Sequence, residues 1–280
     1  MPRRTLAGPA SFEGPALHTG GVTHLVARPG APGQGIRFRR TDLPGSPEVA
    51  AELAAVEATE RRTALGAAPA TIHTVEHVLA ALNALELDDL TLELDGPEPP
   101  ILDGSFGPFV EGFVRAGIRE HPGGVTTFRL RAPVEVQAGD ASYRAEPHPG
   151  LRLSVTLAFD HPAIGVQRGT WDVTPDGFRR ELAAARTFGL LREVEALRAR
   201  GLALGASHAN AIALDDHGVV GTTLRWPDEF VRHKAGDLVG DLALLGGRLH
   251  AHVRADRPSH HGNVALARAL AAAAVKEIVT

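Results

Sequence analysis

Alternating apolar and polar residues, interrupted by two stretches with apolar residues at helical spacing, organise the first part of the chain. Alternation with a period of two is typical of half-buried strands, whereas apolar residues three and four positions apart are typical of amphipathic helices. Thr74 stands just before the longer helical stretch and is expected to serve as its N-cap. The pattern predicts strands at 23–28, 35–39 and 90–94 and helices at 75–85 and 109–116.

The pattern returns to strand-like segments after His121-Pro-Gly-Gly124, which is the best candidate for a domain boundary. Four segments beyond it predict one antiparallel set of strands, at 125–130, 134–136, 142–145 and 151–158. Farther along, the pattern predicts helices at 176–186, 190–200 and 228–245, with strand-like segments at 202–204 and 211–214. The last part of the chain is predicted to have a strand at 248–253, a turn at 258–263 and a C-terminal helix that ends near residue 278.

The segments 74–85 and 230–245 are weakly similar, because each is an apolar helical stretch with a histidine near its start and a predicted strand after it. We therefore expect an α+β fold with two similarly built domains, 1–121 and 122–280, and a βαβ insertion at about 189–216. Each domain should have a small, mostly antiparallel sheet with helices packed on one face. The helices of the two domains should be sandwiched together.

The composition limits the kinds of site and partner that the chain can have. The 280 residues include 14 histidines and no cysteine, so a metal site has to use His, Asp and Glu, and disulfides and cysteine nucleophiles are excluded. The net charge is -4 and no basic run is present, which argues against nucleic acid as a partner. Because no apolar run has the length of a membrane span and the opening MPRRTLAGPASFEG lacks the apolar core of a signal peptide, we expect a soluble, cytoplasmic protein without an integral membrane segment.

The segment 231–241, VRHKAGDLVGD, has a spacing that suits a metal site. His233, Asp237 and Asp241 would share one face of a helix, and an imidazole and a carboxylate one turn apart can hold a divalent metal from one side. A buried helix with a satisfied His–Asp pair is the alternative, and this pattern alone favours it. A catalytic metal site needs a third protein ligand, for which His77 in the other half is the natural candidate.

Further residues could supply acid–base chemistry beside such a metal. Glu76 adjoins His77 and could act as a general base, although a glutamate in the first turn of a helix is by default a surface residue favoured by the helix dipole. His260 and His261 lie in the predicted turn, where a protonated histidine could serve as a general acid with Asp241 as its carboxylate partner. Two exposed histidines in that turn are the alternative.

In combination, these motifs resemble the family of UDP-3-O-acyl-N-acetylglucosamine deacetylases, the zinc enzymes of lipid A biosynthesis. The matching segments occur in family order and cover essentially the whole chain. They are LHTG (17–20), FRRTDLP (38–44), TVEHVLAAL (74–82), PILDGSFGPFV (100–110), FDHPAIG (159–165), ARTFGLLREVEALRARGLALGAS (185–207) and DEFVRHKAGDLVGD (228–241).

The resemblance implies a role for each matching site residue. His77, His233 and Asp237 would be the zinc ligands, with Fe2+ as the alternative metal for this donor set. The resemblance implies His260 as the acid rather than its neighbour, because the family has a His-x-x-Asn pattern and Asn263 follows at the right distance. The remaining implied roles are general base for Glu76, partner of the acid for Asp241, oxyanion contact for Thr187, a position near the substrate phosphates for Lys234, and substrate contacts for Phe188 and His18.

The activity implied by the resemblance is hydrolysis of the N-acetyl group of UDP-3-O-acyl-N-acetylglucosamine. Separately from the resemblance, we expect the protein to be a monomer. Two alternatives remain open at this point: a zinc amidohydrolase that acts on another N-acyl sugar, and a catalytically silent paralogue that binds a nucleotide sugar. His208 stands where an aromatic residue is common in the family. Because the resemblance implies that this insertion forms the passage for the acyl chain of the substrate, the preferred length of that chain is left open. Thr63-Ala64-Leu65 replaces a stretch in which many members have a cysteine that is not a metal ligand.

Overall fold

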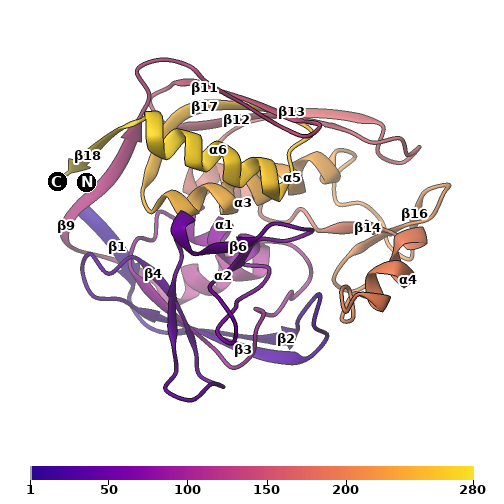
Figure 1. Cartoon of the computed structure of the whole chain (residues 1–280), viewed down its shortest axis with the longest axis horizontal. Coiled ribbons are helices and arrows are strands. Elements are labelled where there is room, and N and C mark those ends of the chain that lie inside the picture. The colour runs from indigo at the N-terminus through magenta and orange to yellow at the C-terminus, as the bar shows by residue number, and fades with distance from the viewer. Residues whose placement is uncertain (1) are drawn as a thin grey trace.

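The computed structural model describes residues 2–280 and has an α+β fold, which confirms the predicted class (Figure 1). Figure 1 shows a larger sheet at the top, a five-stranded sheet at the bottom and the main helices between them. The helices are α1 (Glu76–Ala84), α2 (Gly107–Ala116), α3 (Pro175–Glu181), α4 (Leu191–Ala199), α5 (Glu229–Leu242) and α6 (His260–Ala273). Helix α1 packs against α5, and α5 packs against α6.

The five-stranded sheet has the order β2-β3-β8-β4-β5 and confirms the strands predicted in the first part of the chain. Its strands are β2 (Ala10–Pro15), β3 (Val22–Pro29), β8 (Leu90–Leu94), β4 (Ile36–Arg40) and β5 (Glu48–Ala50). Alternate residues of β3 are buried, as its period-two pattern predicts, and belong to the same core as residues of α1 and α2. A short hairpin of β6 (Val56–Ala58) and β7 (Ala64–Leu65) precedes α1.

The larger sheet differs from the predicted antiparallel set. Its strands are β1 (Pro2–Leu6), β9 (Ile118–Arg129), β10 (Val134–Ala138), β11 (Ala141–Pro147), β12 (Leu151–Ala158), β13 (Val166–Asp172), β17 (Arg248–Asp256) and β18 (Val275–Val279). Strand β17 lies between β11 and β12 and pairs in parallel with β12 and β9. The prediction of four contiguous antiparallel strands is therefore wrong, because a strand from far along the chain separates β11 from β12.

The predicted break at 121–124 is part of a strand. The first half of β9 pairs with β1 and the second half with β18. The register shifts where Pro2 pairs with Gly124, and Gly123 has a φ of +117° that a residue with a side chain rarely adopts. This glycine lets the strand continue through a bulge, so the Pro-Gly-Gly sequence does not form a linker. The division into domains 1–121 and 122–280 stays a proposal, with β9 crossing the boundary.

Several helix ends also differ from the prediction. Thr74 does not cap α1: it has a φ of +54° and its hydroxyl donates to Glu98, while Val75 precedes the helix without a side-chain cap bond. Helix α3 ends before the predicted residue 186, since Arg186 instead enters a buried ion pair with Glu229. The predicted turn at 258–263 contains the first residues of α6, and the segment predicted as the end of that helix is strand β18.

The region that follows α3 contains a βαβ unit. Strands β14 (Phe188–Leu190) and β15 (Ile212–Leu214) pair in parallel and α4 connects them, with β16 (Val219–Val220) added beside β15. The segment 202–204 is not a strand, because its backbone turns at Ala203, whose φ is +54°. Within residues 2–280, no helix is long and apolar enough to cross a membrane.

Candidate metal centre and active site

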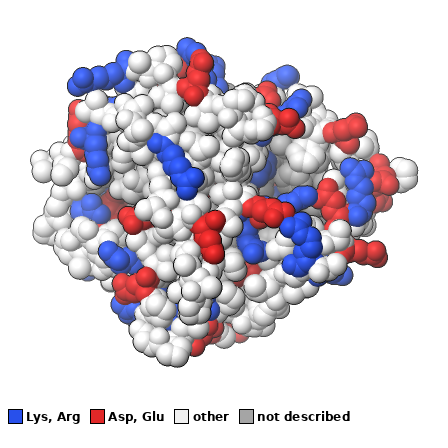
Figure 2. Space-filling view, viewed as in Figure 1, with Lys and Arg blue, Asp and Glu red and all other residues white. Residues whose placement is uncertain are grey.

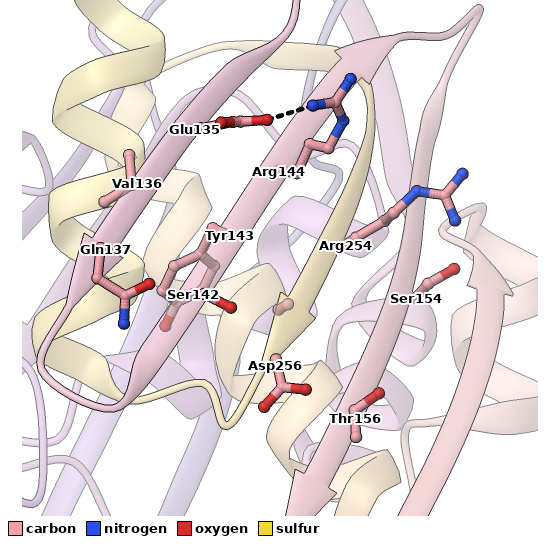
Figure 3. A pocket seen from close by; sticks show the side chains of 11 residues that line it. Glu135, Val136, Gln137, Ser142, Tyr143, Arg144, Ser154, Thr156, Arg254 and Asp256 are labelled. Carbon is pink, nitrogen blue, oxygen red and sulfur yellow. Dashed lines mark hydrogen bonds and ion pairs between the residues drawn. The ribbon is translucent and has the colours of Figure 1, made fainter.

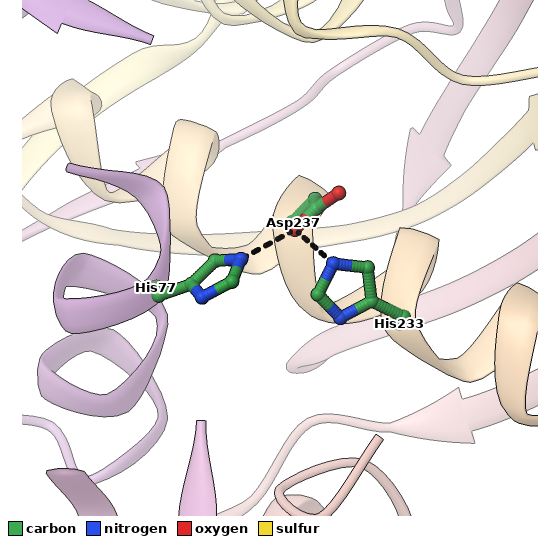
Figure 4. A group of neighbouring side chains, drawn as sticks. All are labelled: His77, His233 and Asp237. Atoms are coloured by element: carbon green, nitrogen blue, oxygen red, sulfur yellow. Dashed lines mark ion pairs between the residues drawn. The ribbon is translucent and has the colours of Figure 1, made fainter. Parts of the chain in front are cut away.

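Two helices bring three metal-binding side chains together. His77 is the second residue of α1, and His233 and Asp237 lie one turn apart on α5 (Figure 4). One ligand atom from each lies within 4.8 Å of the others. Oδ1 of Asp237 is 3.6 Å from Nε2 of His77 and 3.3 Å from Nε2 of His233. All three side chains are buried, so both imidazoles and the carboxylate face one enclosed point.

Glycines in α5 allow this close approach of the two helices. A Cβ added to Gly240 would lie 2.0 Å from the carbonyl oxygen of Glu76, which belongs to the backbone of α1 and cannot rotate away. A Cβ at Gly236 would lie 2.2 Å from the ring of Phe106. The Asn83 side chain also donates to the carbonyl of Val239 at 2.8 Å. The distance between His77 and the α5 ligands is therefore set by small residues.

The donor set fits a divalent metal. Nδ1 of His233 donates to the carbonyl of Ala185 at 3.1 Å, which leaves Nε2 with its lone pair toward Asp237. Oδ1 of Asp237 is buried and has no hydrogen-bond partner within residues 2–280, an arrangement that a bound cation would satisfy. Two imidazoles and one carboxylate from the protein are the ligand set of many catalytic zinc sites.

The surroundings keep these ligands in the protonation states that bind metal. Burial, together with the neighbouring His233, lowers the pKa of His77 to about 3, and burial also lowers the pKa of His233. Burial opposes the charge on Asp237, but His233 and Lys234 hold the pKa of this carboxyl well below its usual range. Neutral imidazoles and an ionised carboxylate are the forms that coordinate a cation.

Glu76 lies beside the three ligands and is buried, so the alternative of a surface residue is wrong for it. Its Oε2 accepts a hydrogen bond from the backbone N–H of Thr63 at 3.1 Å, and its Oε1 is 3.8 Å from Nε2 of His260. Burial raises the pKa of Glu76 to about 7, an effect that His260 opposes and Asp241 reinforces. A carboxyl group in this setting can exchange a proton near neutral pH.

His260 is the first residue of α6 and is buried, whereas His261 is exposed. The alternative of two exposed histidines is therefore wrong for His260. Its Nδ1 donates to Oδ2 of Asp241 at 2.9 Å. Burial opposes protonation of His260, but Asp241 and Glu76 raise its pKa to about 9. A positively charged imidazole thus faces the Glu76 carboxylate across the site.

Three of the predicted substrate-contacting residues, His18, Thr187 and Phe188, line a pocket of about 390 Å³ beside the insertion. The ring of Phe188 is also 6.3 Å from that of His233, so this pocket adjoins the metal-binding group. His18 accepts a hydrogen bond from the N–H of Ala203, and burial lowers its pKa to about 4. Much of the remaining wall is apolar, formed by Leu190, Leu191, Val194, Leu197 and Ile212.

Lys234 is closer to the metal-binding group than its predicted place near the substrate phosphates suggests. Its ammonium group donates to Oδ2 of Asp237 at 2.7 Å. Burial would lower the pKa of Lys234, but the ion pair with Asp237 raises it above the ordinary value. Lys234 thus binds Oδ2 of Asp237 and leaves Oδ1 available as a metal ligand.

Sequence reasoning missed several residues that hold the site together. The Thr63 hydroxyl donates to Oδ1 of Asp241 at 2.6 Å, and the Asn263 amide donates to Oδ2 at 2.8 Å. The fully buried carboxylate of Glu229 binds both the side chain and the backbone N–H of Arg186, next to the Ala185 carbonyl that orients His233. The His-x-x-Asn pattern was the only signal for Asn263, and no local pattern marked Thr63.

Comparison with known proteins identifies the family of the chain. The family model described as UDP-3-O-acyl N-acetylglycosamine deacetylase matches residues 3–272. The chain belongs to this family. Curated relatives named UDP-3-O-acyl-N-acetylglucosamine deacetylase include one from Thermosynechococcus vestitus, 43% identical over 270 residues that cover 96% of this chain and 94% of the relative. The relative from Phenylobacterium zucineum is 44% identical over 275 residues, which cover 97% of this chain and 94% of the relative. The relative from Nitratidesulfovibrio vulgaris is 42% identical over 271 residues, which cover 96% of this chain and 88% of the relative.

This deacetylase-family chain also has a larger groove, of about 670 Å³, on the outer face of β10, β11, β17 and β12 (Figure 3). An ion pair between Glu135 and Arg144 crosses it, and its other polar groups include Ser154 and Arg254. The groove contains none of the metal-binding residues. Figure 2 shows acidic and basic side chains interspersed over the visible face, without a large area of one sign. The metal-binding group lies away from this groove, enclosed between α1 and α5.

Proposed function

We propose that this protein hydrolyses the N-acetyl group of UDP-3-O-acyl-N-acetylglucosamine, giving UDP-3-O-acyl-glucosamine and acetate in lipid A biosynthesis. The observation that carries the proposal is the buried group of His77, His233 and Asp237, with Glu76 and His260 beside it, in a chain of the deacetylase family. A protein that only bound a nucleotide sugar would have no need of this combination of ligands, base and acid.

His77, His233 and Asp237 would hold a zinc ion, or Fe2+ as the alternative for the same donor set. A metal bound there supplies a Lewis acid that polarises an acyl oxygen and lowers the pKa of water to about 7. The hydrogen bond from His233 to the Ala185 carbonyl supports this assignment, since a ligand histidine commonly donates its other ring N–H in this way.

The chain's own side chains would carry the proton transfers. Glu76 takes a proton from the water whose oxygen bonds to the acetyl carbonyl carbon, and the hydroxyl of Thr187 donates a hydrogen bond to the resulting oxyanion. His260, held by Asp241, then delivers a proton to the sugar nitrogen as the carbon–nitrogen bond breaks. The products are acetate, the free amine and one proton released to solvent. Transfer of the proton from Glu76 to His260 restores both side chains, so atoms and charges balance with water as the only co-substrate.

The pocket lined by Phe188 and His18 would take the O-linked acyl chain, since much of its wall is apolar. Lys234 has three N–H donors and could keep its bond to Asp237 while donating to the substrate. These substrate contacts are part of the proposal and explain why an acylated sugar would be preferred to a sugar without the acyl chain.

Acetate release from UDP-3-O-acyl-N-acetylglucosamine tests the proposal. We expect turnover by the metal-loaded protein, loss of turnover after treatment with a chelator, and recovery on return of zinc or Fe2+. UDP-N-acetylglucosamine without the acyl chain is the matched control and should react much more slowly. Full activity of metal-free protein would refute the mechanism, and equal rates on both sugars would favour an amidohydrolase of another N-acyl sugar.

A further inference from the structure

Thr63 lies between β6 and β7, is completely buried and has no part in the mechanism above. All three of its polar groups are nevertheless directed at the site. The hydroxyl donates to Oδ1 of Asp241 at 2.6 Å, the backbone N–H donates to Oε2 of Glu76 at 3.1 Å, and the backbone carbonyl accepts from the N–H of Val75 at 3.3 Å. One residue thus contacts the proposed base, the partner of the proposed acid and the start of α1.

The carboxylate of Asp241 shows what the hydroxyl contributes. Its Oδ2 accepts from Nδ1 of His260 at 2.9 Å and from the Asn263 amide at 2.8 Å, and its Oδ1 accepts from Thr63. Because Asp241 is fully buried, loss of the Thr63 hydroxyl would leave Oδ1 without that donor and free the carboxylate to rotate. The ring of His260 would then lose its fixed direction toward the site.

The side-chain amide of Asn263, which donates to Asp241, is itself fixed by a hydrogen bond to its oxygen. The hydroxyl of Tyr143 donates to Oδ1 of Asn263 at 2.9 Å, which directs the amide N–H group toward Asp241. Asp241 is therefore fixed by α6 on one oxygen and by the β6–β7 segment on the other. The Thr63 arm of this network also donates a hydrogen bond to Glu76, through its backbone N–H.

We infer that Thr63 is a positioning residue that fixes the carboxylates of Glu76 and Asp241 together, and through Asp241 the imidazole of His260. Thr63 sets the direction of the base and the acid relative to each other, because both hydrogen bonds come from one rigid residue. The inference rests on the proposed function, since it concerns the same base and acid.

Thr63→Val tests the inference, because valine keeps the shape and the backbone N–H of threonine and lacks only the hydroxyl. We expect kcat to fall about ten- to hundredfold, with KM and bound metal nearly unchanged. Thr63→Ser keeps the hydroxyl and should stay within about threefold of the parent kcat. Parental kcat in T63V, or an equal loss in T63S and T63V, would overturn the inference. If T63V does not accumulate as folded protein, Thr63→Ala takes its place with the same expectations.

A double-mutant cycle separates positioning through Asp241 from a general effect on packing. In an Asp241→Asn background, T63V should reduce kcat far less than it does in the parent, because the carboxylate that the hydroxyl holds is gone. An undiminished further loss in that background would overturn the inference. A parent protein that releases no acetate would count against the proposed function, whereas an active parent with an unaffected T63V variant would count against the role of Thr63 alone.

Discussion

Glu76 and His77 are neighbours in the sequence, yet their side chains face different partners. Glu76 lies against Thr63 and His260, whereas Nε2 of His77 faces Asp237. Successive residues of a helix point about 100° apart, so one turn of α1 can present a base and a metal ligand side by side. The two functions should therefore be separable by single substitutions.

Substitution of each residue should give a different combination of metal content and activity. Glu76→Gln should keep the metal and lose at least about a hundredfold in turnover, because the amide has nearly the same size and cannot accept the proton. His77→Ala should lose metal and activity together, since only two ligands remain. Metal analysis and acetate release on the same preparations check both expectations. Loss of metal from E76Q, or full metal retention in H77A, would contradict this assignment.

The site could be predicted from the sequence only where it is local or follows a family motif. The spacing of His233 and Asp237 indicates a shared helix face, and the structure has it. His233 and Asp237 lie close to His77 because α1 packs against α5. No local pattern in the sequence indicates this packing, and the proximity was predicted from the family motifs. The bond between Thr63 and Asp241 joins residues 178 positions apart and had no such motif.

Among the elements, the contact between α1 and α5 depends on Gly240. Without a tertiary contact, Gly→Ala inside a helix would stabilise it by about 1 kcal/mol. Here the added Cβ would lie 2.0 Å from the carbonyl oxygen of Glu76, so the helices must move apart. We expect Gly240→Ala to lower the free energy of unfolding by about 3 kcal/mol and to weaken metal binding, because His77 moves relative to the α5 ligands.

Urea unfolding with and without metal measures both effects of Gly240→Ala. Gly150→Ala is the control, because a Cβ there would meet no atom within 4 Å and should change stability by less than about 0.5 kcal/mol. A G240A protein as stable as the parent, with unchanged metal affinity, would show that the approach of the two helices does not set the site.

Elements with a strong period were predicted well, and those defined by long-range pairing were not. The period of β3 is visible in the sequence because alternate residues of the strand are buried. Helices α1 and α5 are buried on nearly all sides, and the helical spacing of their apolar residues still marks them. The segment 275–279 was assigned to a helix, but its backbone pairs with β9 instead. Alanine-rich sequence continues up to Ala274, and the chain changes from helix to strand where Val275–Val279 pairs with β9.

At the scale of the whole molecule, a buried carboxylate joins the two sheets. Asp89 precedes β8 of the five-stranded sheet, and its side chain is completely buried. It accepts hydrogen bonds from the Arg3 guanidinium of β1 at 2.6 and 2.7 Å and from the N–H of Gly35 at 2.7 Å, and it lies 2.9 Å from Nε2 of His121 on β9. The sequence pattern predicted β8 as a strand, but it predicted neither β1 nor this connection between the sheets.

This connection should make stability depend on pH in a defined direction. Burial alone would raise the pKa of Asp89, but the hydrogen bonds from Arg3 and Gly35 hold it below the ordinary value. A lowered pKa in the folded state stabilises the protein above the unfolded value of about 3.9, and that contribution is lost as the pH falls further. Asp88 has the opposite shift, since burial raises its pKa, so its contribution improves as the pH falls.

Asp89→Asn isolates the contribution of Asp89, because Asp88 is present in both proteins and cancels from the difference. We expect the variant to be less stable than the parent by about 3 kcal/mol at neutral pH, since the half-buried Arg3 guanidinium loses its charged, fully buried partner. The gap should narrow below about pH 4, because the Asp89 carboxyl of the unfolded parent takes up a proton at a higher pH than that of the folded parent. Asp172→Asn, which breaks the exposed ion pair with Arg152, is the control and should cost less than about 1 kcal/mol. Urea unfolding of the three proteins across this pH range decides the matter, and a gap that stays constant into acid would show that Asp89 is not the ionised link between the sheets.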